Sequence, residues 1–106
     1  MPNKWRRFEI LLPVRFNDGA EIPADWLGEA VTEVVEQFGA ASFETQTIEG
    51  QWRHASTLYR DTLGKLVVDV HDNDINRQWM KSYRDRWKIR LKQIELWLVS
   101  YPITVE

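Results

Sequence analysis

Apolar residues recur at every second position in some segments of this chain and at helical spacing in others. The order of these segments constrains the fold more than any other feature. Over residues 8–16 apolar residues alternate with others, which is the pattern of a β-strand with one buried face. Over residues 23–39 they recur at helical spacing, and Gly39 then provides a helix stop. A strand followed by a helix is therefore expected at the start of the chain.

The next segments predict a hairpin. Residues 42–54 and 57–71 are rich in β-branched and aromatic residues, and a short turn at Ala55-Ser56 is the simplest connection between them. This turn places Trp52 opposite Tyr59. Gly50 and Gly64, inside the two strands, are expected to be β-bulges.

A second helix and a last strand complete the pattern. Asp72, Asn73 or Asp74 can cap a helix that begins near Asp74, and every fourth residue after it is apolar, namely Ile75, Trp79, Tyr83, Trp87 and Leu91. Strict spacing by four drifts around a helix, so Met80 is expected to help cover the sheet. Alternation resumes at Ile94 and predicts a last strand that ends between Pro102 and Val105.

Strand, helix, hairpin, helix and strand is the order of the ferredoxin-like βαββαβ unit, a two-layer α+β sandwich. We therefore predict one ferredoxin-like domain over residues 1–106, with an antiparallel-rich four-stranded sheet in the order four, one, three, two. Right-handed crossovers place both helices on one sheet face. A β-grasp-like or other small α+β sheet is the alternative.

Strand alternation divides the sheet residues between two faces. The consistently apolar set must face the helices: Phe8, Ile10, Leu12, Val14, Leu66, Val68, Val70, Ile94, Leu96 and Leu98. The opposite face is also too apolar to be merely solvated, and such a patch is typical of a partner surface or of self-association. We expect a homodimer whose candidate interface residues are Leu11, Trp52, Tyr59, Val67, Val99 and Tyr101.

A candidate ligand site follows from the expectation that strands one and three are parallel neighbours. Their carboxyl ends would then bring Arg15, Asp69 and His71 together, with Glu95 and Trp97 added by the start of the last strand. Both helix amino termini would point the same way and favour an anion there. An acid beside an imidazole can also support proton transfer. A polar network at a dimer interface is the alternative explanation for the same residues.

Composition and motifs exclude several kinds of chemistry. The chain has no Cys, so it lacks disulfides, thiolate nucleophiles and cysteine metal sites, and a reducing cytoplasmic location is expected. Asp72 and Asp74 beside Asp69 and His71 are more simply helix caps than metal ligands. Phosphate-binding glycine loops and hydrolase motifs are absent from the sequence, so no metal, cofactor or catalytic residue is predicted. No segment is apolar enough to predict a membrane span.

The formal net charge is only -2, but acidic and basic residues lie in different segments of the chain. No Lys or Arg occurs between Phe16 and Trp52, whereas this stretch holds eight acidic residues, and the second helix is basic. Two oppositely charged helices side by side attract each other, and this is the favoured explanation. A polyanion is the alternative partner, and it would contact Lys81, Arg84 and Lys88, although no RNA-binding signature is present.

Three segments carry a resemblance: GQWR at residues 50–53, LVVDV at 66–70 and ELWLVSYPI at 95–103. In these the chain resembles short bacterial α/β proteins that share a GxWR turn and a terminal ExWLxxYPI strand. The resemblance implies a bacterial source and a stand-alone domain. No activity or catalytic residue is implied by it.

These observations favour a non-enzymatic homo-oligomeric binding or regulatory module. The first alternative is a small-molecule enzyme or ligand sensor of the dimeric α+β barrel kind, with a small ligand held between the sheet and its partner. The second is a nucleic-acid-binding protein that uses the basic second helix.

Overall fold

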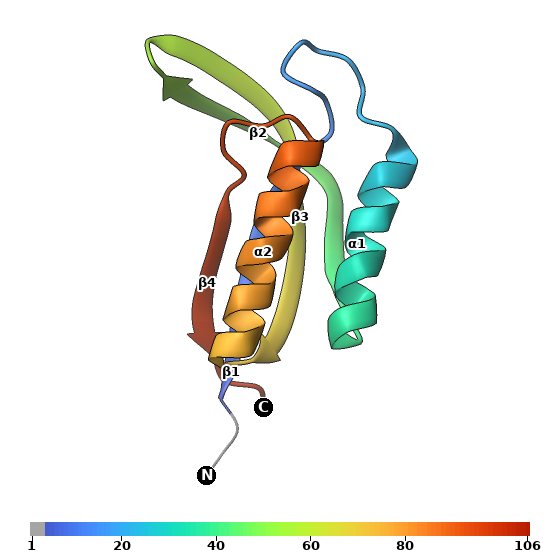
Figure 1. The fold of residues 1–106 in the computed structure, drawn as a ribbon, viewed down its shortest axis with the longest axis vertical. Helices are drawn as coiled ribbons and strands as arrows, with labels where there is room; N and C mark the ends of the chain where they lie inside the picture. Colours follow the sequence, from blue (N-terminus) through green and yellow to red (C-terminus); the bar gives the residue numbers. More distant parts are fainter. Residues whose placement is uncertain (1–3) are drawn as a thin grey trace.

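Two helices lie side by side over one face of a four-stranded sheet (Figure 1). This computed structural model describes residues 4–106, except for the side chains of residues 45–52 and 57–62. The elements follow the predicted order: β1 (Trp5–Pro13), α1 (Ala24–Phe38), β2 (Ser42–His54), β3 (Thr57–His71), α2 (Asp74–Arg90) and β4 (Leu98–Ile103).

The strand order is β2-β3-β1-β4, as predicted, and the α+β ferredoxin-like prediction is confirmed. All neighbouring strands are antiparallel. The expectation of parallel β1 and β3 is therefore wrong. The helical crossover makes β2 parallel to β1, and the hairpin then turns β3 back, so β3 must run against β1.

The helices are antiparallel for the same reason. Because α1 follows β1 and α2 follows β3, their amino termini lie at opposite ends of the sheet (Figure 1). Asn73 caps α2 by accepting a hydrogen bond of 2.8 Å from the Asn76 amide. The two amino termini thus cannot act on one anion.

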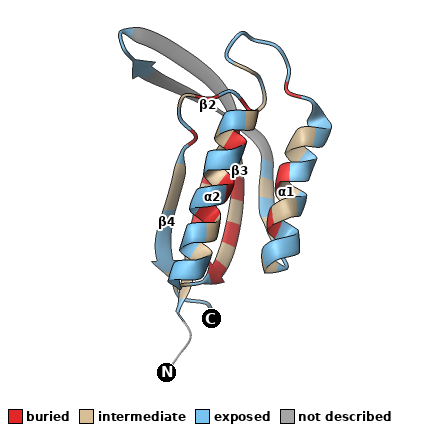
Figure 2. Ribbon diagram, in the orientation of Figure 1, coloured by how far each residue is buried: buried red, intermediate tan, exposed pale blue. Residues whose placement is uncertain are grey.

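The core lies between the helices and the sheet (Figure 2). Alternate residues of β1 and β3 are buried there as predicted, including Ile10, Leu12 and Leu66. Val14 and Ile94 are only partly buried because they lie outside the regular strands. Burial of this apolar surface is the main stabilising contribution to the fold.

Two predicted details of α2 and β4 differ from the structure. Ile75 is 80% exposed, because each step of four residues advances about 40° around a helix and carries it away from the buried Tyr83. Regular pairing of β4 begins at Leu98, not Ile94, although the Trp97 carbonyl already accepts a hydrogen bond of 3.0 Å from the Leu11 amide.

The hairpin turn lies at Ala55-Ser56, as predicted, and both residues have positive φ, 48° and 72°. Positive φ at both central positions is typical of a two-residue type I′ turn. The register pairs Trp52 with Tyr59, as expected. The irregularity in this pairing falls in β2 between Glu44 and Ile48, so neither Gly50 nor Gly64 is itself the bulge.

Gly64 has a packing role instead. The Phe43 ring lies directly over it, and a Cβ at this position would overlap the ring. Gly28, in the exposed part of α1, has no atom near the position of a Cβ. The two glycines therefore form a matched pair for substitution.

We predict that Gly64→Ala destabilises the protein by about 1–3 kcal/mol, because the ring must move out of a packed position. Gly28→Ala should stabilise it by about 0.5–1 kcal/mol, because alanine is the better helix former. Urea unfolding followed by Trp fluorescence measures both. Equal stability of Gly64→Ala and the wild type would contradict this account of the Phe43 contact.

Candidate functional site

The sheet face that the helices do not cover is called the open face here. Its side chains come from alternate positions of the four strands, and the register brings them into rows. The described members include Trp5, Arg7, Glu9, Leu11, Ser42, Glu44, Lys65, Val67, Asp69, His71, Val99 and Tyr101.

Charged groups occupy the centre of the open face and are paired across strands. Arg7 makes a bidentate ion pair with Asp69, with nitrogen–oxygen distances of 2.7 and 3.0 Å. Lys65 Nζ lies 3.1 Å from Glu9 Oε1, and the Tyr101 hydroxyl donates a hydrogen bond of 2.5 Å to Glu9 Oε2. The Glu9 side chain is only 18% exposed. A partly covered, fully paired polar cluster therefore spans β4, β1 and β3.

These contacts hold the groups in their charged forms. The hydrogen bond from Tyr101, followed by that from Lys65, lowers the pKa of Glu9 below its ordinary value. The hydrogen bond to Asp69 raises the pKa of Arg7, and the hydrogen bond to Glu9 raises the pKa of Lys65. The ionised forms of the cluster are thus mutually stabilised.

The five predicted ligand residues do not converge, and the site proposed for Arg15, Asp69, His71, Glu95 and Trp97 needs correction. His71 pairs with Trp5 at the start of β1, whereas Arg15 lies beyond the end of that strand. At about 3.3 Å per residue, Trp5 and Arg15 are about 30 Å apart. The physical reason is the antiparallel direction of β3, which carries its carboxyl end away from that of β1.

Each of these residues has a local partner or an exposed position. Asp69 pairs with Arg7, and the His71 ring packs against Trp5 at a tilt of 34°, with ring centroids 4.2 Å apart. Arg15 pairs with Glu21 at 3.4 Å. Glu95 and Trp97 are exposed in the segment before β4.

The predicted interface residues that the structure describes do share the open face. Val67 and Val99 flank Glu9 in one row, with Leu11 and Tyr101 in the neighbouring rows. The side chains of Trp52 and Tyr59 lie outside the described residues. An interface at this surface stays a prediction.

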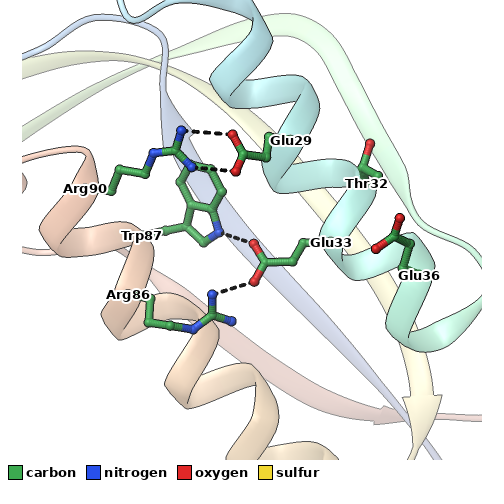
Figure 3. A pocket seen from close by; sticks show the side chains of 7 residues that line it. All are labelled: Glu29, Thr32, Glu33, Glu36, Arg86, Trp87 and Arg90. Carbon is green, nitrogen blue, oxygen red and sulfur yellow. Dashed lines mark hydrogen bonds and ion pairs between the residues drawn. The ribbon is translucent and has the colours of Figure 1, made fainter.

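A groove lies between α1 and α2, on the helical side of the molecule (Figure 3). Its volume is about 440 Å³, and its lining residues are Glu29, Thr32, Glu33, Glu36, Arg86, Trp87 and Arg90. Arg90 makes a bidentate contact with Glu29 at 2.8 and 2.9 Å. Arg86 and the Trp87 indole nitrogen both contact the carboxylate of Glu33 (Figure 3). Long polar side chains therefore bridge the two helices.

The attraction between oppositely charged helices, favoured from the sequence, is present in these pairs. Arg90 is further held between two indole rings, 4.6 Å from the Trp26 centroid and 4.7 Å from the Trp87 centroid. Two basic residues of α2, Arg86 and Arg90, are thus paired with α1 and are less available to a polyanion.

The residues considered for nucleic-acid contact do not form one cluster of unpaired cations. Arg84 pairs with the neighbouring Asp85 at 2.7 Å, Lys81 is exposed, and Lys88 is half-buried. This arrangement does not strengthen the nucleic-acid alternative.

The sequence reasoning missed two groups of residues. The pairs among Arg7, Glu9, Lys65 and Asp69 depend on the register of distant strands, and only the correct direction of β3 reveals them. A signal was available for the groove, because Glu29, Glu33 and Glu36 follow the i, i+4, i+7 spacing of one helix face.

In the part of the chain that the structure describes, no helix is both long and apolar enough to cross a bilayer.

We predict that Tyr101→Phe raises the pKa of Glu9 toward its ordinary value of 4.5, because the largest cause of its depression is removed. A carboxylate with a lowered pKa stabilises the fold above about pH 4.5 and loses this effect as the pH falls through its folded-state pKa. The stability lost in Tyr101→Phe should therefore be larger at about pH 7 than at about pH 2.

Carboxyl carbon NMR titration measures the pKa of Glu9, and urea unfolding at the two pH values measures the stability. Arg15→Gln is the control, because this residue lies far from Glu9 and should leave its titration unchanged. An unaltered Glu9 titration in Tyr101→Phe would show that the hydroxyl contact does not persist in solution.

Comparison with known proteins identifies the fold. No protein-family model matches the sequence, and a search of curated proteins finds no match. Among solved structures, the chain is similar to CutA1 from Oryza sativa, with a TM-score of 0.66 and 8% identity over 98% of this chain and 84% of that one. It is also similar to the divalent ion tolerance protein CutA1 from Ehrlichia chaffeensis, with a TM-score of 0.63 and 6% identity over 100% and 87% of the two chains.

A third similar structure is a phage SAM lyase in complex with S-methyl-5′-thioadenosine, with a TM-score of 0.68 and 10% identity over 100% of this chain and 93% of that chain. Identities this low establish a common fold, and function does not follow from fold. The chain has the ferredoxin-like fold of the CutA1 structures.

Proposed function

We propose that this protein is a homo-oligomeric binding or regulatory module in which the open faces of two copies pack together. The observation that carries the proposal is the paired charge cluster at the centre of a sheet face that the helices leave uncovered and that also carries Leu11, Val67, Val99 and Tyr101. A two-fold dimer is the expected form, because a self-complementary surface then buries itself against an identical copy.

The charge balance of the open face favours a second copy over a charged partner. Arg7 and Lys65 carry two positive charges, and Glu9, Asp69 and Glu44, which pairs with Lys65 at 3.9 Å, carry three negative charges, so the net charge of these five residues is only -1. A surface with so little net charge gives only weak long-range attraction to a polyanion or a polycation. Covering these groups is also less costly because their hydrogen bonds are already made within one copy.

Apolar side chains around the cluster supply the contact surface. Val67 and Val99 are half-buried beside Glu9, and Tyr101 is 41% exposed. Trp97, in the segment that leads into β4, is 64% exposed. Large aromatic side chains of this kind contribute most of the binding energy in many interfaces.

Sedimentation velocity over a range of protein concentrations tests the proposal, with an oligomer expected for the wild type. Val67→Lys should raise the dissociation constant about tenfold or more, because the added charge would be buried between copies. The new lysine would lie opposite Glu9 in the β1–β3 pair, and opposite charges at such a position are favourable within one copy.

The matched control is Ile89→Lys, which places the same charge at an apolar position of α2 that is 79% exposed on the other side of the molecule. This variant should associate like the wild type. A wild type that remains monomeric at all concentrations, or equal effects of the two variants, would refute an interface at the open face.

A further inference from the structure

We infer that Pro102 prevents β4 from pairing with β4 of a second copy, so that self-association does not extend the sheet across this edge. The inference concerns the edge of the sheet and not its open face. It therefore goes beyond the proposed function and can hold or fail independently of it.

β4 is the last strand of the sheet, and its outer edge is uncovered. The order β2-β3-β1-β4 places it at one side of the molecule (Figure 1), and in the part of the chain that the structure describes only β1 pairs with it. An edge strand presents unpaired backbone N–H and C=O groups, which can pair with the same strand of another copy. Such pairing would join two sheets into one.

The hydrogen bonds between β1 and β4 show which backbone groups of β4 point outward. The Leu11 amide donates a hydrogen bond of 3.0 Å to the Trp97 carbonyl, directly before the regular register of the two strands. In an antiparallel ladder, hydrogen-bonded pairs alternate with pairs whose N–H and C=O groups point away from each other. Every second residue from Trp97 therefore bonds to β1, and the residues between them direct their backbone groups to the outer edge: Leu98, Ser100 and Pro102.

Pro102 removes one donor from this edge. It has no backbone N–H, and its ring occupies the space in front of the nitrogen where a partner carbonyl would lie. In a two-fold antiparallel pair centred on Ser100, Pro102 of each copy would face the Leu98 carbonyl of the other. Both carbonyls would then be covered without receiving a hydrogen bond, which is unfavourable. Pro102 is exposed, so its ring adds little to the core of one copy.

The rest of β4 has the composition of a strand that would otherwise associate. Its sequence, LVSYPI, holds no charged residue and is rich in residues that favour strands. The strand at the opposite edge, β2, instead contains charged residues in its sequence. Charged side chains and proline are two common means of protecting a sheet edge. Proline is the one that the sequence of β4 supplies.

Pro102→Thr tests the inference, because it restores the missing N–H with a residue that favours strands. Sedimentation velocity should show association at least about tenfold tighter than in the wild type, since each copy gains a hydrogen bond across the edge. The matched control is Pro23→Thr, the same change at an exposed proline before α1, which should associate like the wild type. Equal association of Pro102→Thr and the wild type would overturn the inference.

Moving the proline along the edge tests the role of its position. Ser100→Pro combined with Pro102→Thr places the ring at another residue whose N–H points outward, so the hydrogen bonds to β1 are retained. This double variant should lose the association that Pro102→Thr gains, and urea unfolding checks that it is folded. A folded double variant that associates as tightly as Pro102→Thr would contradict pairing through this edge.

Amide hydrogen exchange locates the contact. The Leu98 and Ser100 amides should exchange rapidly in the wild type and slowly in associated Pro102→Thr, whereas the Tyr101 amide, which bonds to β1, should be slow in both. Slow exchange of Leu98 and Ser100 in the wild type would show that the edge is already paired and would refute the inference. Pro102→Thr should also associate when combined with Val67→Lys, which separates this result from the outcome for the open face.

Discussion

The antiparallel pairing of β1 with β3 is the constraint on which the rest of the structure depends. It sets Trp5 opposite His71 and Pro13 opposite Leu63, and so determines which side chains share a row on each face. The helices that follow these strands must then run in opposite directions. This direction is what places Glu29 beside Arg90, and Glu33 beside Arg86, across the groove.

The two faces of the sheet carry different kinds of side chain and contribute differently to stability. The covered face buries apolar side chains under both helices, which is the main source of stability. The open face instead pairs Arg7 with Asp69 and Lys65 with Glu9, and such partly exposed pairs contribute little to folding. Because these charges are already paired within one copy, a partner could cover this face without burying an unpaired charge.

In the helical layer, polar contacts join the two helices to each other. Polar bridges join α1 to α2 above the core, and the Tyr83 hydroxyl donates a hydrogen bond of 2.8 Å to the Ala30 carbonyl beneath them. These bridges pair Glu29 with Arg90 and Glu33 with Arg86, so the charges that face each other across the two helices are compensated.

The sequence by itself determined the elements, the two-residue turn at Ala55-Ser56, and the opposite charges of the two helices. Each is a short-range property: side-chain period, turn chemistry and composition act within a few residues of one another. The shared face of Val67, Val99 and Tyr101 could also be predicted, because strand alternation decides it. The predicted crossover and hairpin already require β3 to run against β1, so the separation of Arg15 from His71 also follows from the element order. Only the tertiary structure decided that Glu9 meets both Lys65 and Tyr101, because the register of strands that are distant in the sequence depends on packing that no local pattern records.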